Sequence, residues 1–594
     1  MSAAPAPVDG GEGGGGSVPQ DDGTALASVE NGEAVGIPSI AGVLRGLTMA
    51  VAQARPVTRE ATRLARDVAR IVRGTEEHLP LAKDKRFADP AWSQNPAYRR
   101  LSQCYLAAGG AASRLVDDLE TQDRDWHDVE RARFAVNALI GVLAPTNLLP
   151  TNPAALKRAF DTGGASVVRG LAHAAHDVRH NGGMPSQTDR SAFTVGEDLA
   201  MTPGAVIARD EVAELIQYSP TTPTVRSRPV LVIPPPIGRY YFLDLRPGRS
   251  FVEYALGQGL QVFMLSWRNP QQEQADWGMD TYAARILDAV QTMREVTGSD
   301  DVNTIGFCAG GILMSTVLSH LAQAGPPVVH SASYGVTLLD FASEAPIGAF
   351  SAPRLLELAR RDSRRRGVIS ARSMGTVFAW MRPDDLIFNY VVNQWLMGND
   401  PPVFDILAWN ADGTNLPARL HEQFLGVFRD NTLTRPGGLT VLGTPVDLSR
   451  IDLPTFVTGA VNDHLTPWTG CYRTTELLSG PSTFVLSNAG HVASLVNPPG
   501  NPKASYWVGG EPGGDPHTWR DSAEQRTGSW WEAWSQWVLE RSGEPTDAPA
   551  DLGSETFRVL EPAPGSYVLD RVPDHERAPG RRPATGRPTR GGGR

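Results

Sequence analysis

The residues that constrain the fold most are 306–310, which read Gly-Phe-Cys-Ala-Gly. The strand-like run 302–305 precedes them, and the apolar, helix-like run 311–318 follows them. Glycines on both sides of a reactive side chain let the backbone turn sharply between a strand and a helix, which is the geometry of a nucleophile elbow. The pattern predicts that Cys308 is exposed at this turn, although a buried packing cysteine fits the same five residues.

The order of polar residues after Cys308 supports the elbow. Asp463 follows the strand-like run 453–459, and His491 follows a second such run at 483–487. A nucleophile, then an acid, then a histidine, each at the end of a strand, is the order found in α/β-hydrolases. The interval between the acid and the histidine leaves room for one helix and one strand. We therefore predict a catalytic triad of Cys308, Asp463 and His491.

A triad of this kind has a definite division of labour. The thiolate is the reactive form of cysteine, and a neighbouring histidine and a helix N-terminus both favour it. Asp463 is expected to hold the imidazole of His491 in the productive tautomer. Transfer from a thioester to a thiol keeps the acyl group reactive, so that it can pass on to a hydroxyl. Cysteine at position 308 therefore suits an acyltransferase that uses coenzyme A thioesters better than it suits a hydrolase.

The oxyanion that forms during attack needs two hydrogen-bond donors. The first is expected to be the backbone N–H of Ala309, the residue after the nucleophile, and the second an N–H in the loop 234–239. Three prolines in that loop carry no N–H, so Ile237 or Gly238 is the candidate. We take Ile237 as the second member of the predicted oxyanion hole.

Other residues compete for roles at the site. Asp340 also ends a strand-like run and is a second candidate for the acid. His464 follows Asp463 immediately and is expected to be structural, because it cannot occupy the position after the last strand. Cys471 is expected to pack within a helix. The arginines at 364–366 either meet coenzyme A phosphates or form a solvated face, and the solvated face is the simpler interpretation.

At 594 residues the chain exceeds what one hydrophobic core usually holds. Strand-like runs alternate with helix-like runs from Pro229 onward, which predicts a parallel sheet. An insertion that is too long for a loop follows Asp340 and is rich in aromatic residues, so we expect a cap over the active site. The predicted organisation is a disordered tail at 1–40, a mostly helical N-terminal domain at 41–200, an α/β-hydrolase catalytic domain at 201–543 with a large cap insertion at about 341–450, and a disordered C-terminal tail at 544–594.

Apolar residues at 57, 61, 64, 68 and 71 recur at helical spacing, while arginines occupy the other faces. This pattern predicts a basic amphipathic helix. Packing on its own domain or on a partner helix is the simpler interpretation, and association with a lipid or polymer surface is the alternative.

Composition narrows the class of protein further. The net charge of −10 does not favour a nucleic-acid partner, and no apolar run is long enough for a transmembrane segment. Cys104, Cys308 and Cys471 are widely separated, so they form neither a metal-binding spacing nor a disulfide framework. No secretory signal is evident. These features favour a cytoplasmic protein that uses no metal or cofactor.

Several segments resemble the polyhydroxyalkanoate synthases of class I or II, bacterial enzymes that polymerise (R)-3-hydroxyacyl-coenzyme A. The likeness runs from about residue 87 to residue 543. The segments that look like family signatures are 87–92, 389–393, 409–412, 463–468, 490–493, 497–499 and 505–507. The resemblance implies that Cys308 carries the acyl group, that His491 is the general base and that Asp463 is its catalytic partner. It also implies a homodimer on the surface of polymer inclusions.

The chain departs from the family pattern in two respects: the first concerns the loop that faces the site, and the second leaves the preferred monomer length open. Gly238 stands where the family commonly has asparagine. Segments 180–183 and 185–187 look like the medium-chain class, whereas 307–309 is closer to the short-chain class. Two other functions are weighed against the polymerase. One is a depolymerase or thioesterase on the same fold, and the other is a non-catalytic granule scaffold, which has no need of all three triad residues.

Overall fold

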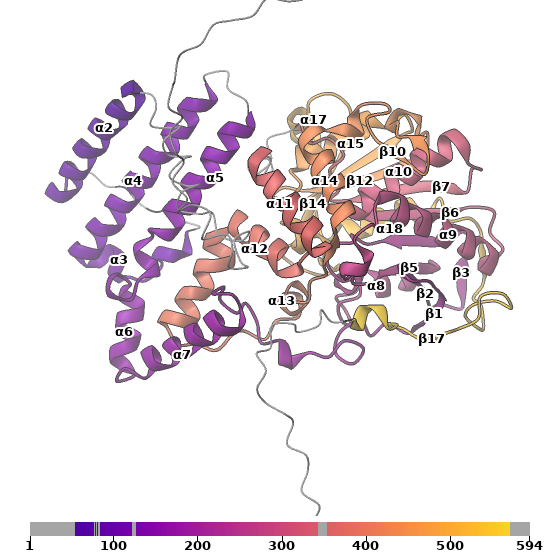
Figure 1. Cartoon of the computed structure of the whole chain (residues 1–594), viewed down its shortest axis with the longest axis horizontal. Coiled ribbons are helices and arrows are strands. Elements are labelled where there is room, and N and C mark those ends of the chain that lie inside the picture. The colour runs from indigo at the N-terminus through magenta and orange to yellow at the C-terminus, as the bar shows by residue number, and fades with distance from the viewer. Residues whose placement is uncertain are drawn as a thin grey trace, which may run out of the picture.

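The computed structural model describes residues 54–75, 78, 80, 84–121, 126–342 and 353–570 (Figure 1). The tail predicted at 1–40 lies outside these residues, as does the last part of the chain, 571–594. A layer of helices from the N-terminal part lies beside an α/β part built on one large sheet. Helices α11, α12 and α13 lie between the two (Figure 1).

The N-terminal layer is mostly helical in its described residues, and the helices Pro96–Glu120 and Pro153–Asp161 begin at asparagine caps. The side chain of Asn95 accepts from the amide of Ala97, and that of Asn152 accepts from the amide of Ala155; a proline follows each cap, where its missing N–H costs nothing. The helices of this layer are α2 (Ala54–Arg73), α3 (Ala91–Gln94), α4 (Pro96–Glu120), α5 (Trp126–Val142), α6 (Pro153–Asp161) and α7 (Ala165–His180).

The α/β part is organised by a sheet that has eleven strands in the described part of the chain, in the order β15-β14-β13-β12-β7-β6-β4-β5-β2-β1-β17. The six strands from β13 to β5 run parallel, and the strands outside them pair antiparallel. The strands of this sheet are β1 (Gly204–Arg209), β2 (Ala213–Tyr218), β4 (Val230–Ile233), β5 (Val262–Trp267), β6 (Val302–Phe307), β7 (Val329–Gly335), β12 (Thr455–Ala460), β13 (Ser482–Ser487), β14 (Ser505–Val508), β15 (Glu524–Thr527) and β17 (Glu561–Pro562). This sheet confirms the predicted α/β class.

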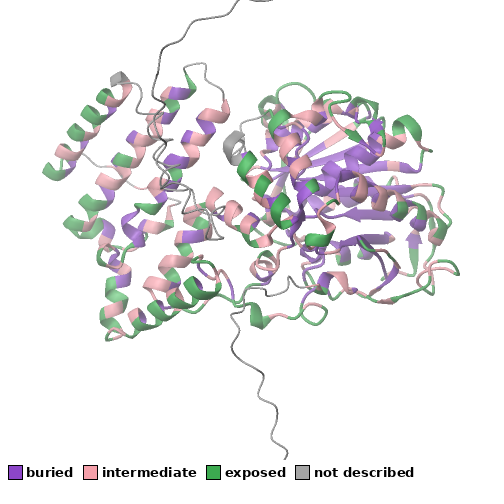
Figure 2. Cartoon of the chain, viewed as in Figure 1, coloured by how far each residue is buried: buried purple, intermediate pink, exposed green. Residues whose placement is uncertain are grey.

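Helices cover both faces of the sheet. Alternate residues of β4 enter opposite cores: Leu231 and Ile233 lie in one apolar cluster, Val230 and Val232 in the other. Figure 2 shows the central strands buried throughout. The helices of this part are α8 (Phe251–Gly257), α9 (Met279–Thr297), α10 (Ala309–Ala324), α11 (Pro353–Arg366), α12 (Ala371–Met381), α13 (Asp405–Asn410), α14 (Ala418–Asp430), α15 (Trp468–Leu477), α16 (His491–Leu495), α17 (Pro516–Ser522) and α18 (Trp530–Leu539).

The segment between β7 and β12 holds helices α11 to α14 and two π-helices, η8 (Asp384–Phe388) and η9 (Val391–Leu396). Its short strands are β8 (Val368–Ile369), β9 (Leu416–Pro417), β10 (Thr440–Val441) and β11 (Thr444–Pro445). The π-helical stretch is held by the N-terminal layer, because Trp395 Nε1 donates to Asp177 Oδ2 over 2.8 Å and Arg86 Nη1 pairs with Asp384 Oδ2 over 2.8 Å. The insertion therefore joins the two parts of the molecule.

The prediction of a disordered tail from residue 544 is wrong for residues 544–570. In this segment β16 (Pro545–Asp547) pairs with β3 (Thr224–Arg226), and β17 pairs with β1 at the edge of the large sheet. Proline and glycine in this segment mark turns between two short strands, of which β16 bonds to β3 in a separate two-stranded sheet and β17 bonds to the large sheet. Composition alone does not distinguish such a stretch from a disordered one.

Candidate active site

Cys308 lies at the sharp turn between β6 and α10. Its backbone has φ 50° and ψ −122°, a conformation that an L-residue rarely adopts and that hydrogen bonds hold in place. Its amide donates to the carbonyl of Gly335 over 2.9 Å, and its carbonyl accepts from Thr337 Oγ1 over 3.2 Å. Its side chain is half-buried at the N-terminus of α10. The elbow predicted from residues 306–310 is thus present.

The glycines around Cys308 are needed because other backbone atoms pass close to them. A Cβ on Gly306 would lie 2.6 Å from the Cα of Gly311, and a Cβ on Gly310 would lie 2.3 Å from the carbonyl oxygen of Ile233. Gly311 is as crowded, because its Cβ would lie 2.2 Å from Thr337 Oγ1. The absence of side chains lets α10 start directly against the end of β4.

Asp463 and His491 follow the ends of two neighbouring parallel strands, β12 and β13, which brings their side chains together. His491 Nδ1 lies 2.7 Å from Asp463 Oδ2, and both residues are buried. Thr466 Oγ1 donates to the same carboxylate oxygen over 2.7 Å, and the amides of Leu465 and Thr466 donate to Asp463 Oδ1 over 2.8 and 3.0 Å. Hydrogen bonds therefore fix both oxygens of the carboxylate, and Oδ2 is the one that faces the imidazole.

The charges of these groups shift each other's proton affinity. Burial opposes the charged form of His491, yet the Asp463 carboxylate and the Cys308 thiolate, with their hydrogen bonds, hold the pKa of His491 well above its ordinary value. Burial likewise opposes ionisation of Asp463, but the charge and hydrogen bond of His491, together with Thr466, leave the pKa of Asp463 below its ordinary value. Because Nδ1 of His491 faces the carboxylate, Nε2 is the nitrogen left for the thiol. The three predicted triad residues thus lie in one cluster.

The candidate oxyanion donors lie on either side of the elbow. Ala309 is the first residue of α10, in the turn where backbone N–H groups have no acceptor within the helix. Across from it, the loop after β4 contains Ile237 and Gly238, and the amide of Gly238 donates to Thr414 Oγ1 over 2.8 Å. Since the Gly238 N–H is already engaged, Ile237 remains the predicted donor from this loop.

Asp340 and Cys471, which competed with the predicted triad residues, make contacts elsewhere. Asp340 accepts from Asn431 Nδ2 over 2.8 Å and from Arg473 Nη1 over 3.2 Å, so it serves a structural network away from His491. Cys471 is buried in α15 with its Sγ 3.6 Å from the carbonyl oxygen of Thr466, and burial raises the pKa of its thiol well above the ordinary value. It is a packing residue, as predicted.

His464 lies next to the predicted triad and faces the insertion. Burial, together with the nearby guanidinium of Arg382 in the insertion, lowers the pKa of His464 to about 4. Its ring is therefore neutral at physiological pH, and the charges of Asp463 and His491 are both felt there. This places the segment around Arg382 close to the candidate site.

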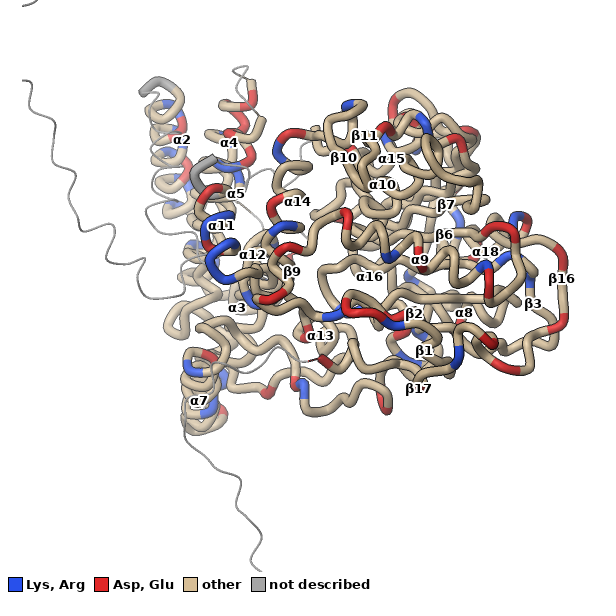
Figure 3. The backbone as a smooth tube through the Cα atoms, turned by 45° about the vertical axis from the view of Figure 1, so that its right-hand side comes forward, with Lys and Arg blue, Asp and Glu red and all other residues tan. Residues whose placement is uncertain are grey.

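The arginine-rich end of α11, blue in Figure 3, is exposed to solvent. Arg364 pairs with Glu422 across to α14, with Nη2 2.5 Å from Oε1, and Arg365 and Arg366 both pair with Asp362 of the same helix. These arginines are already matched by carboxylates of the protein surface.

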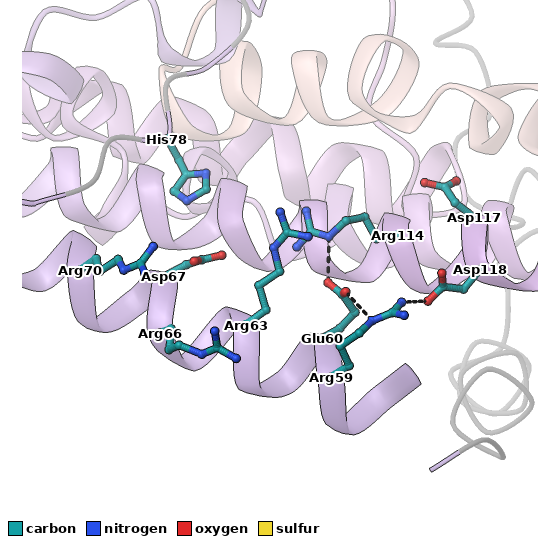
Figure 4. A pocket seen from close by; sticks show the side chains of 10 residues that line it. All are labelled: Arg59, Glu60, Arg63, Arg66, Asp67, Arg70, His78, Arg114, Asp117 and Asp118. Carbon is teal, nitrogen blue, oxygen red and sulfur yellow. Dashed lines mark hydrogen bonds and ion pairs between the residues drawn. The ribbon is translucent and has the colours of Figure 1, made fainter. Parts of the chain in front are cut away.

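The predicted amphipathic helix at 57–71 is confirmed as part of α2, and it packs on its own domain. Figure 4 shows the pocket between α2 and α4, where buried Glu60 accepts from Arg114 Nε over 2.8 Å. Arg59 bonds to Glu60 and to Asp118. The arginines of this pocket lie among four carboxylates, those of Glu60, Asp67, Asp117 and Asp118. Such a mixture of charges supports helix packing rather than a dedicated anion site.

Four residues near the site went unassigned from the sequence. Thr466 holds the Asp463 carboxylate, and Trp409 and Thr414 hold the loop after β4, with Trp409 Nε1 donating to the carbonyl of Arg239 over 2.7 Å. Two of them could have been found from the segments that resemble family signatures, because Thr466 lies in 463–468 and Trp409 lies in 409–412. Arg239 falls in the loop 234–239, but nothing in the sequence indicated its side-chain bonds to Tyr567 and Asp570, which lie more than three hundred residues away.

The fold and this cluster define an α/β-hydrolase-fold enzyme with cysteine at the nucleophile elbow. Residues 244–498 match the family described as "alpha/beta hydrolase fold", and residues 83–255 match the family described as "Poly-beta-hydroxybutyrate polymerase (PhaC) N-terminus". The described residues contain no helix with the length and apolar character needed to cross a membrane.

Similarity to curated proteins extends over most of the chain. Poly(3-hydroxyalkanoate) polymerase 2 of Ectopseudomonas oleovorans is 46% identical over 510 residues, which cover 86% of this chain and 90% of the relative. Polymerase 1 of the same organism is 43% identical over 525 residues, covering 88% and 93%. The PhaC subunit of the polymerase of Cupriavidus necator is 39% identical over 494 residues, covering 82% and 83%. The chain belongs to the poly(3-hydroxyalkanoate) polymerase family, where it resembles classes I and II. It is therefore an acyltransferase.

Proposed function

We propose that this enzyme polymerises (R)-3-hydroxyacyl-coenzyme A, releasing coenzyme A through an acyl-cysteine intermediate on Cys308. The observation that carries the proposal is the cluster of Cys308, His491 and Asp463 at the elbow of a chain from this polymerase family. The thioester is the substrate, and the chemistry requires no further cofactor.

In the acylation step, the Cys308 thiolate attacks the thioester carbonyl carbon and a new C–S bond forms. The carbonyl oxygen becomes an oxyanion, for which the amides of Ala309 and Ile237 are the proposed donors. The bond to the coenzyme A sulfur then breaks, and that sulfur leaves as the thiol after taking the proton held by His491.

In the elongation step, His491 takes the proton from the 3-hydroxyl of an incoming hydroxyacyl group. The hydroxyl oxygen attacks the carbonyl carbon bound to Cys308, so an ester C–O bond forms and the C–S bond breaks. The Cys308 thiolate is regenerated as His491 keeps the proton. Asp463 stabilises the imidazolium and fixes its tautomer throughout.

The proposed partners follow from this product. A growing polyester chain is insoluble, so we place the working enzyme in the cytoplasm at the surface of polymer inclusions, as a homodimer. Apolar side chains that are largely exposed on α6 and α7 support contact with such a surface: Phe160 is 87% exposed and Leu171 is 65% exposed. Serine at both positions is expected to shift the enzyme from sedimenting granules to the supernatant without changing the rate on soluble substrate.

Purified enzyme with 3-hydroxyacyl-coenzyme A of graded chain length tests the proposal. Free thiol and insoluble polymer should appear together, and mass spectrometry should find the acyl group on Cys308. Cys308→Ala should abolish both products, and Cys308→Ser should lose most activity because an alkoxide is harder to generate than a thiolate. Release of thiol with no polymer would instead favour a thioesterase on the same fold, the second candidate function.

A further inference from the structure

Residues 544–570, named the C-terminal strap, run from the end of α18 to the far edge of the large sheet. The strap is the yellow segment beneath β1 and β2 in Figure 1. Its strand β17 pairs with β1 through Ala205 and Val206, and its last described turn is the 3₁₀-helix η12 (Tyr567–Leu569). The final residue of that turn region, Asp570, lies beside the loop that follows β4.

A buried acid anchors the strap. Glu214 of β2 is fully buried, and burial raises its pKa although Arg209 and two backbone amides stabilise its charge. Those amides belong to Ser566 and Tyr567 of the strap, at 3.2 and 3.1 Å. A Cβ on Gly565 would lie 2.4 Å from Glu214 Oε2, so the strap approaches as closely as a glycine allows.

The strap is tied to the segment after β4 by two side chains: Tyr240 Oη donates to the carbonyl of Pro564 over 3.3 Å, and Arg239 makes two bonds. Arg239 is 3% exposed; its Nη1 donates to the carbonyl of Tyr567 over 2.8 Å, and its Nη2 donates to the carbonyl of Asp570. A guanidinium presents its donors in a rigid fork, so two carbonyl acceptors fix both its position and its orientation. The strap thus holds the end of the Arg239 side chain, while Nε of the same guanidinium lies 3.9 Å from Asp412 Oδ2 of the insertion.

The same loop is held from the opposite side by the insertion. Trp409 Nε1 donates to the carbonyl of Arg239 over 2.7 Å, and Thr414 Oγ1 accepts from the amide of Gly238 and donates to the carbonyl of Pro236 over 3.2 Å. The stretch with Ile237 therefore lies between two clamps, one from the insertion and one from the strap.

We propose that Arg239 is a positioning residue through which the C-terminal strap sets the oxyanion loop, so that the strap is part of the catalytic apparatus. The inference rests on the proposed function, because it takes the Ile237 amide as an oxyanion donor. Such a donor acts only within about 2.7–3.1 Å of the oxyanion. Displacements of about 1 Å can cost on the order of 100-fold in rate. Releasing one clamp should therefore slow acylation while substrate binding is retained.

Three variants of the full chain test the role of Arg239. Arg239→Met removes the donors and keeps the apolar stem, and Arg239→Lys keeps the charge. Arg558→Met is the matched control, because Arg558 is an exposed strap arginine whose side-chain hydrogen bond, within the described residues, goes to the nearby carbonyl of Glu555. The probes are 3-hydroxybutyryl- and 3-hydroxyoctanoyl-coenzyme A. Single-turnover acylation of Cys308 should fall about 10–100-fold in the Met variant with KM little changed, recover in part in the Lys variant, and stay normal in the control.

Alkylation of Cys308 by iodoacetamide separates positioning from general damage. This reaction displaces iodide at a saturated carbon and forms no oxyanion, so its rate should be the same in wild type and in both Arg239 variants. A parallel fall in alkylation and acylation would overturn the proposal in favour of a merely structural role, and so would an unchanged acylation rate. If the Met variant does not fold, the Lys variant carries the same comparison.

A change on the strap itself should reproduce the effect. Gly565→Ala pushes the strap away from Glu214 and should give slow acylation with normal alkylation, although it leaves the Arg239 side chain intact. Normal acylation in this variant would overturn the role of the strap. Failure of the proposed function gives a different result, because the wild-type enzyme itself would then carry no acyl label on Cys308.

Discussion

At the scale of single residues, the pKa of His491 depends on the charges of its two neighbours, Asp463 and Cys308. The Cys308 thiolate is one of the groups that raise the pKa of His491, so Cys308→Ala should lower that pKa toward the ordinary value, with Asp463 still holding part of the shift. Titration of the His491 imidazole by NMR measures this change. Cys104→Ala, on α4 of the N-terminal layer, is the matched control and should leave the titration unchanged.

The sign of the linked stability follows from the direction of each shift. The folded state binds the His491 proton more tightly than the unfolded state, so this contribution is complete below the ordinary pKa of 6.5 and is lost as pH rises through the folded-state pKa. The lowered pKa of Asp463 acts in the opposite range: its contribution is present above the ordinary value of 3.8 and is lost as pH falls through the folded-state pKa. Stability conferred by the pair should be greatest between these ranges.

Asp463→Asn should separate the two chemical steps. The amides of Leu465 and Thr466 would keep the asparagine oxygen, which turns its NH₂ group toward His491 Nδ1 and forces the imidazole proton onto Nε2. A proton on Nε2 prevents that nitrogen from acting as a base. Elongation should fall on the order of 10²–10⁴-fold, whereas a first acylation by thiolate already present should survive in part. Single-turnover labelling measures both steps, and equal losses would contradict this division of labour.

At the scale of elements, the close packing of α10 against β4 determines whether the elbow can accept a larger residue in place of its glycines. Gly310→Ala would place a methyl group 2.3 Å from the carbonyl oxygen of Ile233, so overpacking should cost about 1–3 kcal/mol of stability and most of the activity. Gly426→Ala in α14 is the matched control, because open space surrounds that position. The control should gain roughly 0.5–1 kcal/mol from helix propensity. Denaturant unfolding and initial rates measure both, and equal tolerance of the two changes would argue against the close contact.

The strands and the triad cluster were predictable because they depend on local pattern and chain order. Cys308, Asp463 and His491 each follow an apolar run, and the parallel sheet then brings the ends of those runs to one edge. The strap and Arg239 were not predictable, because their bonds join positions about 330 residues apart that carry no periodic signal. The π-helical turns of the insertion were missed for a similar reason, since their extra residue per turn is stabilised by tertiary contacts rather than by spacing.

At the scale of the whole molecule, the N-terminal layer steadies the insertion through Asp177. This buried carboxylate accepts from Trp395 Nε1 over 2.8 Å and from Ser186 Oγ over 2.5 Å. Asp177→Ala leaves these donors without an acceptor, which should lower the stability of the fold by about 1–3 kcal/mol. Amide exchange should then speed up more in the π-helical stretch 384–398 than in β4 or β6. Hydrogen exchange read by mass spectrometry tests this.

The control is Asp161→Ala on α6, which removes a surface ion pair with Lys157 that solvent screens and should leave stability almost unchanged. Exchange in 384–398 that stays as slow as in wild type would show that the N-terminal layer does not steady the insertion.

The pairing of β17 with β1 has a consequence for how the protein is made. Strand β1 begins at Gly204, but its outer partner is Glu561–Pro562, more than three hundred residues later in the chain. During synthesis this edge of β1 therefore stays open until the more than three hundred residues between β1 and β17 have been made, and an open edge can pair with other chains. The same late contact delivers the strap to Arg239. An enzyme built this way gains its full activity only after the strap has been made and has paired with β1, so nascent chains that lack the strap should not begin polymer.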